Sequence, residues 1–268
     1  MTAQDNLASA DPWFFTPDGP GRYQSTVFTL GPWGGNSQHG GPPSALMGRE
    51  MQHHEPREAA EIFRFTAEIL RPVPATSLEV RVRTVRGGRS IELLEGVMTA
   101  DDVEVMRASA WRMTPQIDGV DVPVQVPALP PPSEGTYENF FDIGLERGYH
   151  TAMEWRFIEG AFLKAGPARV WLRQQIPLVP DEEPSPLQRV LCVADSGNGV
   201  SAVADARELT FVNTDLTVHL RRQPRGEWIG MEAETAMDPN GVGLAESVLH
   251  DQDGPIGRGA QILFVGPR

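Results

Sequence analysis

The sequence has one cysteine among its 268 residues and no apolar run near the roughly 18 residues that a membrane-spanning helix needs. A single cysteine excludes an internal disulfide framework and a cysteine-rich zinc site, and it is typical of a protein in a reducing cytoplasm. Because Cys192 lies between Leu191 and Val193, we expect it to be a small buried side chain. The first residues lack a basic segment followed by an apolar stretch, so we expect no export signal and a cytoplasmic location.

Positive charge is also scarce, since 23 basic residues stand against 36 acidic ones and give a formal net charge of −13. Such a chain repels nucleic acids and anionic membrane surfaces, so we expect neither as a partner. An anionic ligand would need a local basic patch. The densest one is "LRRQPR", which contains Arg221, Arg222 and Arg225.

The glycine pair in "HGGPPSALMGREM", residues 39–51, does not belong to a nucleotide-binding loop. The stretch lacks both the G-K-[S/T] ending of a phosphate-binding loop and the G-x-G-x-x-G spacing of a dinucleotide fold. The chain has no G-x-S-x-G motif either, which argues against a serine hydrolase. Glycines at the start of a helix leave backbone N–H groups open to close approach, at the positive end of the helix dipole.

The chain contains the same unit twice. Residues 61–113 and 208–264 each alternate apolar and polar residues in about four segments separated by turns, which predicts four antiparallel strands in hairpin order. Leu94 and Leu244, like Asp101 and Asp251, are about 150 positions apart, with an uncertainty of about one residue. An internal duplication explains this spacing.

A helix candidate precedes each block, at residues 42–54 and 185–206, and a strand candidate precedes each helix, near 23–30 and 168–178. A helix with one apolar stripe and a sheet with one apolar face cover each other when the sheet wraps the helix. We therefore predict an α+β double hot-dog fold, with two tandem hot-dog units that each wrap an antiparallel sheet around a long helix. The predicted units are residues 1–114 and 150–268, with their sheets joined side by side, and a proline-rich linker spans 115–149.

Short motifs follow one another along the chain: "HGGPPSAL", "LRP", a Gly-Gly turn, "MRASA", "VADSG", "NTDLTVHLRR", "EW", "DQDG" and "GAQ". Their order and spacing resemble the acyl-CoA thioesterase II family, over nearly the whole chain outside the linker. The resemblance implies a double hot-dog enzyme that hydrolyses fatty acyl-CoA thioesters without a metal, a cofactor or a covalent intermediate. It also implies a homo-oligomer of double hot-dog units.

The resemblance assigns three catalytic residues, which in this family hold the attacking water. They are an Asp near the start of the second helix, a small polar residue in the next strand and a Gln in the final strand. The matching residues are Asp195, Asn213 and Gln261. Asn213 departs from the threonine of the best-known members, although an Asn side chain can both donate and accept a hydrogen bond. Asp205 lies near Asp195 in the sequence but outside this set.

The remaining candidates bind the substrate. A thioester carbonyl that becomes an oxyanion needs N–H donors, and we expect Gly40 and Gly41 to supply them, with His39 beside them. In hot-dog enzymes both units generally contribute to each site, so the first helix can serve the second unit's water. The basic patch of Arg221, Arg222 and Arg225 is the candidate site for the phosphates of CoA.

The duplication indicates a single site for each chain. Gln261 corresponds to Ala110 or Trp111 in the first half, and Asn213 corresponds to Ile62 or Phe63. Since these counterparts are apolar, we expect that one of two equivalent sites kept its polar chemistry and that hydrocarbon fills the other.

Two other functions stay open. An acyl-CoA or lipid-binding protein without catalysis would fit the departure at Asn213. A hot-dog enoyl-CoA hydratase would need a His a few residues after its Asp, or a His with a carboxylate across the interface. No His follows Asp195 within the predicted helix, and His219 and His250 lie on a predicted strand and beside a turn.

Overall fold

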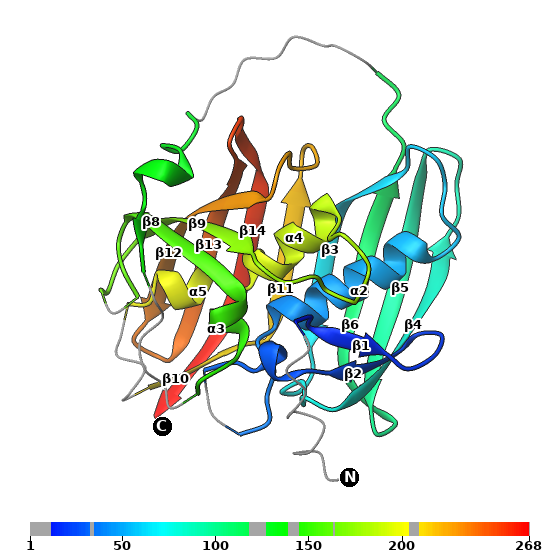
Figure 1. Cartoon of the computed structure of the whole chain (residues 1–268), viewed down its shortest axis with the longest axis horizontal. Coiled ribbons are helices and arrows are strands. Elements are labelled where there is room, and N and C mark those ends of the chain that lie inside the picture. Colours follow the sequence, from blue (N-terminus) through cyan, green and yellow to red (C-terminus); the bar gives the residue numbers. More distant parts are fainter. Residues whose placement is uncertain are drawn as a thin grey trace.

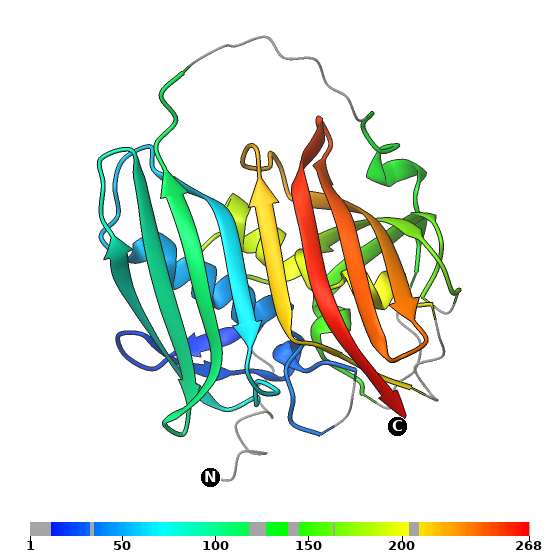
Figure 2. The same ribbon diagram turned by 180° about the vertical axis from the view of Figure 1, so that it is seen from behind.

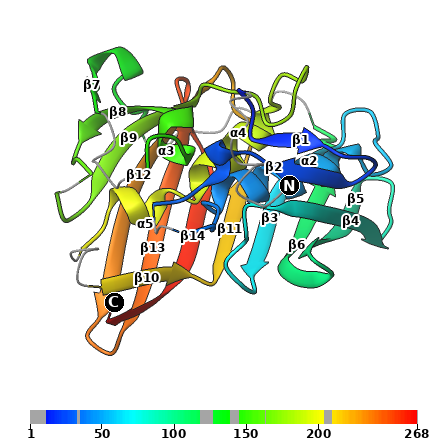
Figure 3. The ribbon, with the colours of Figure 1, turned by 60° about the horizontal axis from the view of Figure 1, so that its bottom comes forward.

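A 14-stranded antiparallel sheet dominates the computed structural model, which describes residues 12–32, 35–117, 127–138, 145–162, 164–203 and 209–267 (Figure 1). Its strands follow the order β1-β2-β4-β5-β6-β3-β11-β14-β13-β12-β9-β8-β7, and β10 pairs with β14 beside this path (Figure 3). The first-half strands are β1 (Phe15–Pro17), β2 (Arg22–Ser25), β3 (Glu61–Ile69), β4 (Ser77–Arg86), β5 (Ile91–Ala100) and β6 (Val103–Met113). The others are β7 (Thr136–Tyr137), β8 (Met153–Glu159), β9 (Ala168–Gln174), β10 (Leu209–Asn213), β11 (Asp215–Leu220), β12 (Trp228–Asp238), β13 (Val242–Asp251) and β14 (Gly254–Pro267).

The helices lie on one face of this sheet, as the views from the front and from behind show (Figures 1 and 2). They are α2 (Gly41–His53), α3 (Tyr149–Ala152), α4 (Pro186–Ala194) and α5 (Gly197–Val200), with short 3₁₀ turns η1 (Val27–Thr29) and η2 (Pro132–Glu134). Apolar side chains from both halves form one buried core between helices and sheet. In the part of the chain that the structure describes, none of the helices has the length and apolar composition that a membrane crossing requires.

The strand pairing of the first half recurs in the second. Thr66 of β3 pairs with Ser109 of β6, and Thr217 of β11 pairs with Ala260 of β14. Thr66 and Thr217, whose hydroxyls lie 3.3 Å apart where β3 meets β11, are 151 positions apart, and so are Ser109 and Ala260. This offset lies within the uncertainty of the sequence estimate.

A register shift is duplicated with the strands. The β5–β6 pairing shifts between Met98 and Thr99, and the β13–β14 pairing shifts between Leu249 and His250, again 151 positions later. The order β3-β6-β5-β4 on one side of the join also matches β11-β14-β13-β12 on the other. As predicted, the two sets of strands form one continuous sheet.

The second helix differs from the prediction of one long helix over 185–206. Its N-terminus is where the sequence predicts it, because Ser185 caps the helix by accepting a hydrogen bond from the Gln188 N–H and Pro186 is the first helical residue. It ends at Ala194, and a separate single turn, α5, follows. The break falls at Asp195 and Ser196, where the Ser196 N–H donates to the Val193 carbonyl and the Asp195 carbonyl accepts a hydrogen bond from the Gln261 amide. Residues 204–206 of the predicted helix lie outside the described part of the chain.

Part of the predicted linker, 115–149, packs against the second half of the sheet. The Trp171 indole N–H donates to the Pro130 carbonyl, and a Cβ on Gly230 would lie 2.9 Å from Leu129. Residues of the linker therefore cover Trp171 and Gly230 in the second half of the sheet, and its last residue, Tyr149, begins α3. Residues 118–126 and 139–144 of the predicted linker lie outside the described part.

Candidate active site

Asp195 lies where the C-terminal end of α4 meets the N-terminal end of α2. A Cβ on Gly41 would lie 2.1 Å from the Cys192 carbonyl oxygen, and one on Gly40 would lie 2.8 Å from the Asp195 carboxylate. Glycine at both positions therefore allows the two helix ends to approach this closely. The N-cap residue Gly40 has no side chain that could cap α2, and the Asp195 carboxylate supplies the negative charge that a helix N-terminus favours.

The structure brings the three predicted catalytic residues together. The Asn213 amide donates to Asp195 Oδ1 at 2.6 Å, and the Gln261 amide donates to the same oxygen at 2.9 Å. Gln261 also donates to the Asp195 backbone carbonyl at 3.2 Å. Asp195 and Gln261 are both only 2% exposed, whereas Asn213 is half-buried. Asn213 is therefore the member of this group that is most exposed to solvent.

The pKa of Asp195 is raised to about 7 because the carboxyl is buried. Hydrogen bonds from the Gly40 backbone, the Asn213 and Gln261 side chains and the Gly41 backbone act in the opposite direction and lower it. A carboxyl group with this pKa can accept a proton and release it again near neutral pH, as a general base must.

His39 lies beside Asp195 as a neutral imidazole, since burial lowers its pKa to about 3. The Gly41 N–H donates to its Nδ1 at 3.1 Å, so this nitrogen carries a lone pair. Nδ1 also lies 3.2 Å from Asp195 Oδ2. Between two acceptors this contact is unfavourable, but it becomes a hydrogen bond once Oδ2 is protonated. His39 therefore favours a proton on Asp195.

The N–H groups predicted to hold an oxyanion already have acceptors. The backbone N–H groups of Gly40 and Gly41 donate to the Asp195 carboxylate, and that of Gly41 also donates to His39. Both glycines therefore lie beside the Asp195 carboxylate, and in this structure their N–H groups donate to Asp195 and His39.

Tyr149, which was not among the predicted site residues, supports this arrangement. Its ring stacks on His39 with centroids 3.7 Å apart, and its hydroxyl lies 2.9 Å from both the Ser196 Oγ and the Cys192 carbonyl oxygen. Tyr149 therefore connects the His39 ring to the break between α4 and α5. No sequence signal points to it, because it falls in the segment predicted as linker.

The arginines proposed for the CoA phosphates lie away from Asp195. They follow the end of β11 opposite to Asn213, about eight extended residues or roughly 26 Å along the strand. Arg222 forms a two-pronged ion pair with buried Asp251, and Arg225 pairs with Asp253. The Arg221 guanidinium donates to the Pro255 carbonyl. The structure does not bring these arginines together with the catalytic group, and Asp205 lies outside the described residues.

The 151-residue offset makes Ala110 the counterpart of Gln261, and Ile62 the counterpart of Asn213. Both counterparts are buried and apolar, as predicted. The expectation that hydrocarbon alone fills this region is wrong, because the counterpart of Leu263 is Arg112, which is 2% exposed.

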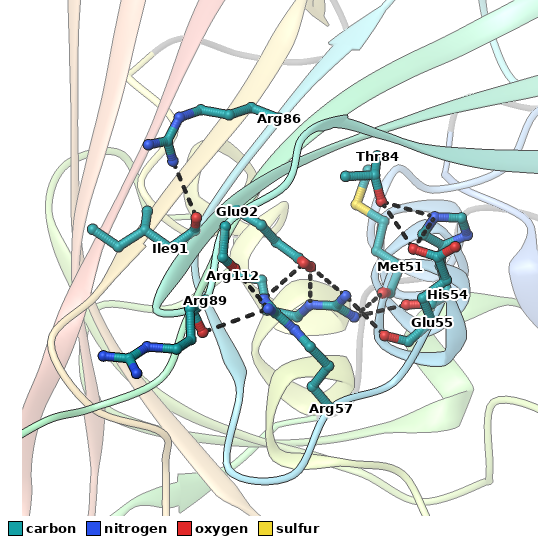
Figure 4. Close-up of polar contacts among 11 residues, drawn as sticks. Met51, His54, Glu55, Arg57, Thr84, Arg86, Arg89, Ile91, Glu92 and Arg112 are labelled. Atoms are coloured by element: carbon teal, nitrogen blue, oxygen red, sulfur yellow. Dashed lines mark hydrogen bonds and ion pairs between the residues drawn. The ribbon is translucent and has the colours of Figure 1, made fainter.

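Arg112 closes the C-terminal end of α2 (Figure 4). Its guanidinium donates to the carbonyls of His54 at 2.8 Å and Glu55 at 3.0 Å, and it forms an ion pair with buried Glu92. Arg57 contacts the other Glu92 oxygen at 2.7 Å. Helix carbonyls that lack partners favour such a cation, which explains a buried charge at this position.

The described residues contain no group of three or more His, Cys, Asp or Glu side chains that could hold a metal ion. The chemistry available at Asp195 is that of a buried base, two amide donors and a neutral imidazole. Such a group can orient a water molecule and take its proton.

Comparison with solved structures identifies the fold class of the protein. The structure is similar to a protein provisionally described as thioesterase II from Thermobifida fusca YX, with a TM-score of 0.75, 16% identity and coverage of 99% of this chain and 98% of that one. A hot-dog protein of unknown function from Alicyclobacillus acidocaldarius gives a TM-score of 0.74 at 15% identity, with coverage of 99% and 98%. An acyl-CoA thioesterase II from Mycobacterium marinum gives 0.66 at 16% identity, with coverage of 100% and 98%. The protein therefore has a hot-dog fold.

Two family models narrow this class. The acyl-CoA thioesterase N-terminal domain matches residues 29–113, and the acyl-CoA thioesterase C-terminal domain matches residues 123–265. The chain belongs to the acyl-CoA thioesterase family and is a thioester hydrolase, as its sequence motifs predicted. No curated protein matches the chain in sequence.

Proposed function

We propose that the protein hydrolyses an acyl-CoA thioester to a free fatty acid and CoA, with a water activated by Asp195, Asn213 and Gln261. The observation that supports this most is one buried carboxyl, with a pKa of about 7, that receives both amide donors on one oxygen. The family match supports the thioester as substrate. The soluble enzyme acts in the cytoplasm and needs no cofactor.

In the proposed reaction the water oxygen attacks the thioester carbonyl carbon while Asp195 takes one of its protons. The tetrahedral intermediate then breaks its C–S bond, and Asp195 returns the proton to the leaving thiolate. His39 accepts a hydrogen bond from the protonated Oδ2 between these two steps. Atoms and charges balance without a covalent enzyme intermediate.

The N–H groups of Gly40 and Gly41 remain our candidates for the oxyanion. They donate to Asp195 while it is ionised, and a carboxyl that has just taken a proton attracts these donors less. The substrate oxygen gains negative charge in the same step. Proton transfer to Asp195 therefore makes the two donors available when the oxyanion forms.

Catalysis is tested by measuring release of free thiol from acyl-CoAs of graded chain length, with wild-type protein and Asp195→Asn. The variant keeps the shape but loses the proton acceptor, so kcat should fall about 10²-fold or more with little change in KM. Asp253→Asn makes the same chemical change at an exposed turn and should leave kcat unchanged. If the wild type bound acyl-CoA without releasing thiol, the non-catalytic binding function would replace this proposal.

We also propose that the chain is a double hot-dog, with units 1–114 and 150–268 joined by 115–149. The repeated strand pairing and the duplicated register shift support this division. Each unit supplies one helix, α2 or α4, to the helical layer, and the proposed site uses residues from both.

A homo-oligomer of these double units is the proposed assembly. The sheet face away from the helices exposes neighbouring apolar side chains on β10, β13 and β14, namely Val212, Val242, Leu244, Ile262 and Phe264. A second copy would remove this surface from water. Light scattering should therefore report a particle larger than 29.4 kDa at micromolar concentration, and a strict monomer would contradict the proposal.

A further inference from the structure

The Asn213 amide can present either of two ends to Asp195. With Nδ2 toward the carboxylate it donates at 2.6 Å, as observed. Turned over, it would place Oδ1 against Asp195 Oδ1 at the same short distance, which is repulsive while the carboxylate is ionised. A threonine hydroxyl at this position would have no such ambiguity, because a single oxygen both donates and accepts.

Asn198 contacts the other end of this amide. Its Nδ2 donates to Asn213 Oδ1 at 3.4 Å, from the single turn α5 that follows Asp195. The same turn approaches Gln261, since a Cβ on Gly197 would lie 3.2 Å from Gln261 Oε1. The turn α5 therefore lies against both residues that donate to Asp195.

Asn198 and Asn213 are half-buried, whereas Asp195 and Gln261 are almost fully buried. The contact between the two asparagines thus lies on the open side of the group, where water and substrate must arrive. Hydrogen bonds of catalytic sites are often long before substrate binds and tighten in the reacting complex, so a distance of 3.4 Å is compatible with a role in turnover.

We propose that Asn198 is a positioning residue that fixes the orientation of the Asn213 amide and thereby the place of the water that Asp195 activates. This inference rests on the proposed hydrolysis at Asp195. While Asp195 is ionised, its negative charge strengthens the hydrogen bond from Asn213 Nδ2. Once Asp195 has taken the proton, this hydrogen bond becomes weaker. The donor from Asn198 keeps Asn213 in place until the proton returns to the leaving group.

The test is a cycle of four proteins: wild type, Asn198→Ala, Asn213→Thr and the double variant. Asn198→Ala should lower kcat about three- to tenfold with little change in KM, which is the effect of one neutral hydrogen bond. In the Asn213→Thr background the same Asn198→Ala change should have no effect, because threonine has no amide to orient. An equal loss in both backgrounds would show a purely structural role of α5 and overturn the inference.

Asn198→Asp gives a second readout. A carboxylate there attracts Asn213 Nδ2 and turns Asn213 Oδ1 toward Asp195, so the acid limb of the pH profile of kcat/KM should move to higher pH. An unmoved acid limb, or full activity of Asn198→Ala, contradicts the inference. Asn240→Ala, in the turn between β12 and β13, is the matched control and should change neither parameter.

Asp195→Asn measured in the same assay separates the two proposals. Active wild type, inactive Asp195→Asn and unchanged Asn198→Ala would overturn the role of Asn198 alone. A wild type without thioesterase activity would overturn the proposed function and the inference with it. Thermal unfolding of each variant identifies any loss that comes from misfolding.

Discussion

At the scale of single residues, the site depends on a conflict at Asp195. Burial penalises its charge, while two side-chain amides and the start of α2 favour it. A carboxylate in water would have a pKa near 4 and would hardly accept a proton at neutral pH. In the proposed reaction, burial is therefore what makes Asp195 a base, because it raises the pKa of a carboxyl whose hydrogen bonds would otherwise keep it ionised.

The pH dependence follows from this base. Asp195 must be ionised to accept the proton, so kcat/KM should be low in acid and rise to a plateau above about pH 7. His39 does not titrate in this experiment, because its pKa of about 3 lies below the measured pH range. Initial rates between pH 5.5 and 9 check this, and a flat profile down to pH 5.5 would contradict a buried base at Asp195.

The two glycines beside Asp195 should respond differently to alanine. In Gly41→Ala the new Cβ meets backbone, the Cys192 carbonyl, so the helices must separate and about 2–3 kcal/mol of stability is lost. In Gly40→Ala it meets the Asp195 side chain, which turns away, so activity falls more than stability. Urea unfolding and thiol release measure the two effects. Gly87→Ala, whose Cβ has no atom closer than 3.9 Å, should change neither.

At the scale of helices and strands, the ends of α2 illustrate how the duplicated halves diverged. The N-terminal end receives Asp195 from the second half, and the C-terminal end receives Arg112 from β6. One end thus serves the proposed chemistry, and the other is closed by a buried ion pair.

Arg112→Met should therefore destabilise the protein without affecting the chemical step. It leaves Glu92 buried with only Arg57 as a cation, and it frees helix carbonyls, which together should cost about 3–5 kcal/mol. Urea unfolding measures this loss, and kcat per folded molecule should stay constant. Arg83→Met breaks an exposed pair with Glu95 and should cost about 0–1 kcal/mol. Equal losses in the two variants would show that the buried pair has no special role.

Alternating side chains predicted the strands well, because one face of each strand is buried and the other faces water. Asp101 and Asp102 form the tight connection between β5 and β6, and both adopt positive φ, which aspartate tolerates better than most residues. The long helix over 185–206 was not predictable in this way, because its apolar residues continue past Ala194 while the contacts of Asp195 end it there. Tertiary contacts override a local pattern at that point.

The candidate site was predictable only in part, for a similar reason. Motif order located Asp195, Asn213 and Gln261, and their contacts agree with that choice. Tyr149 and Asn198 carry no motif, since their positions depend on how α3 and α5 pack around the break after α4. Arg112 was not predicted. With an uncertainty of one residue in the offset between the two halves, the sequence does not determine which side chain of β6 faces α2.

At the scale of the whole molecule, the two halves of the sheet share strand order and pairing but differ in their side chains. The strands repeat at a constant offset across the join, so the backbone could hold an equivalent site on each side. The side chains differ, because the counterparts of Gln261 and Asn213 are Ala110 and Ile62. The first half contributes α2 to the proposed site of the second half, whereas at its own two matching positions it carries buried apolar side chains.

The chain should therefore bind one acyl-CoA and not two. Calorimetric titration of the inactive Asp195→Asn variant with an acyl-CoA substrate measures this number directly, and it should saturate at one ligand per chain whatever the size of the oligomer. A second ligand would need donors in the first half at the places that Ala110 and Ile62 occupy, beside an α2 end already closed by Arg112. Ala110→Trp enlarges a buried residue of the first half only, so it should leave the stoichiometry of the folded protein at one. Saturation at two ligands per chain would mean that the first half kept a binding site despite its loss of amide donors, and that binding in this fold does not depend on them.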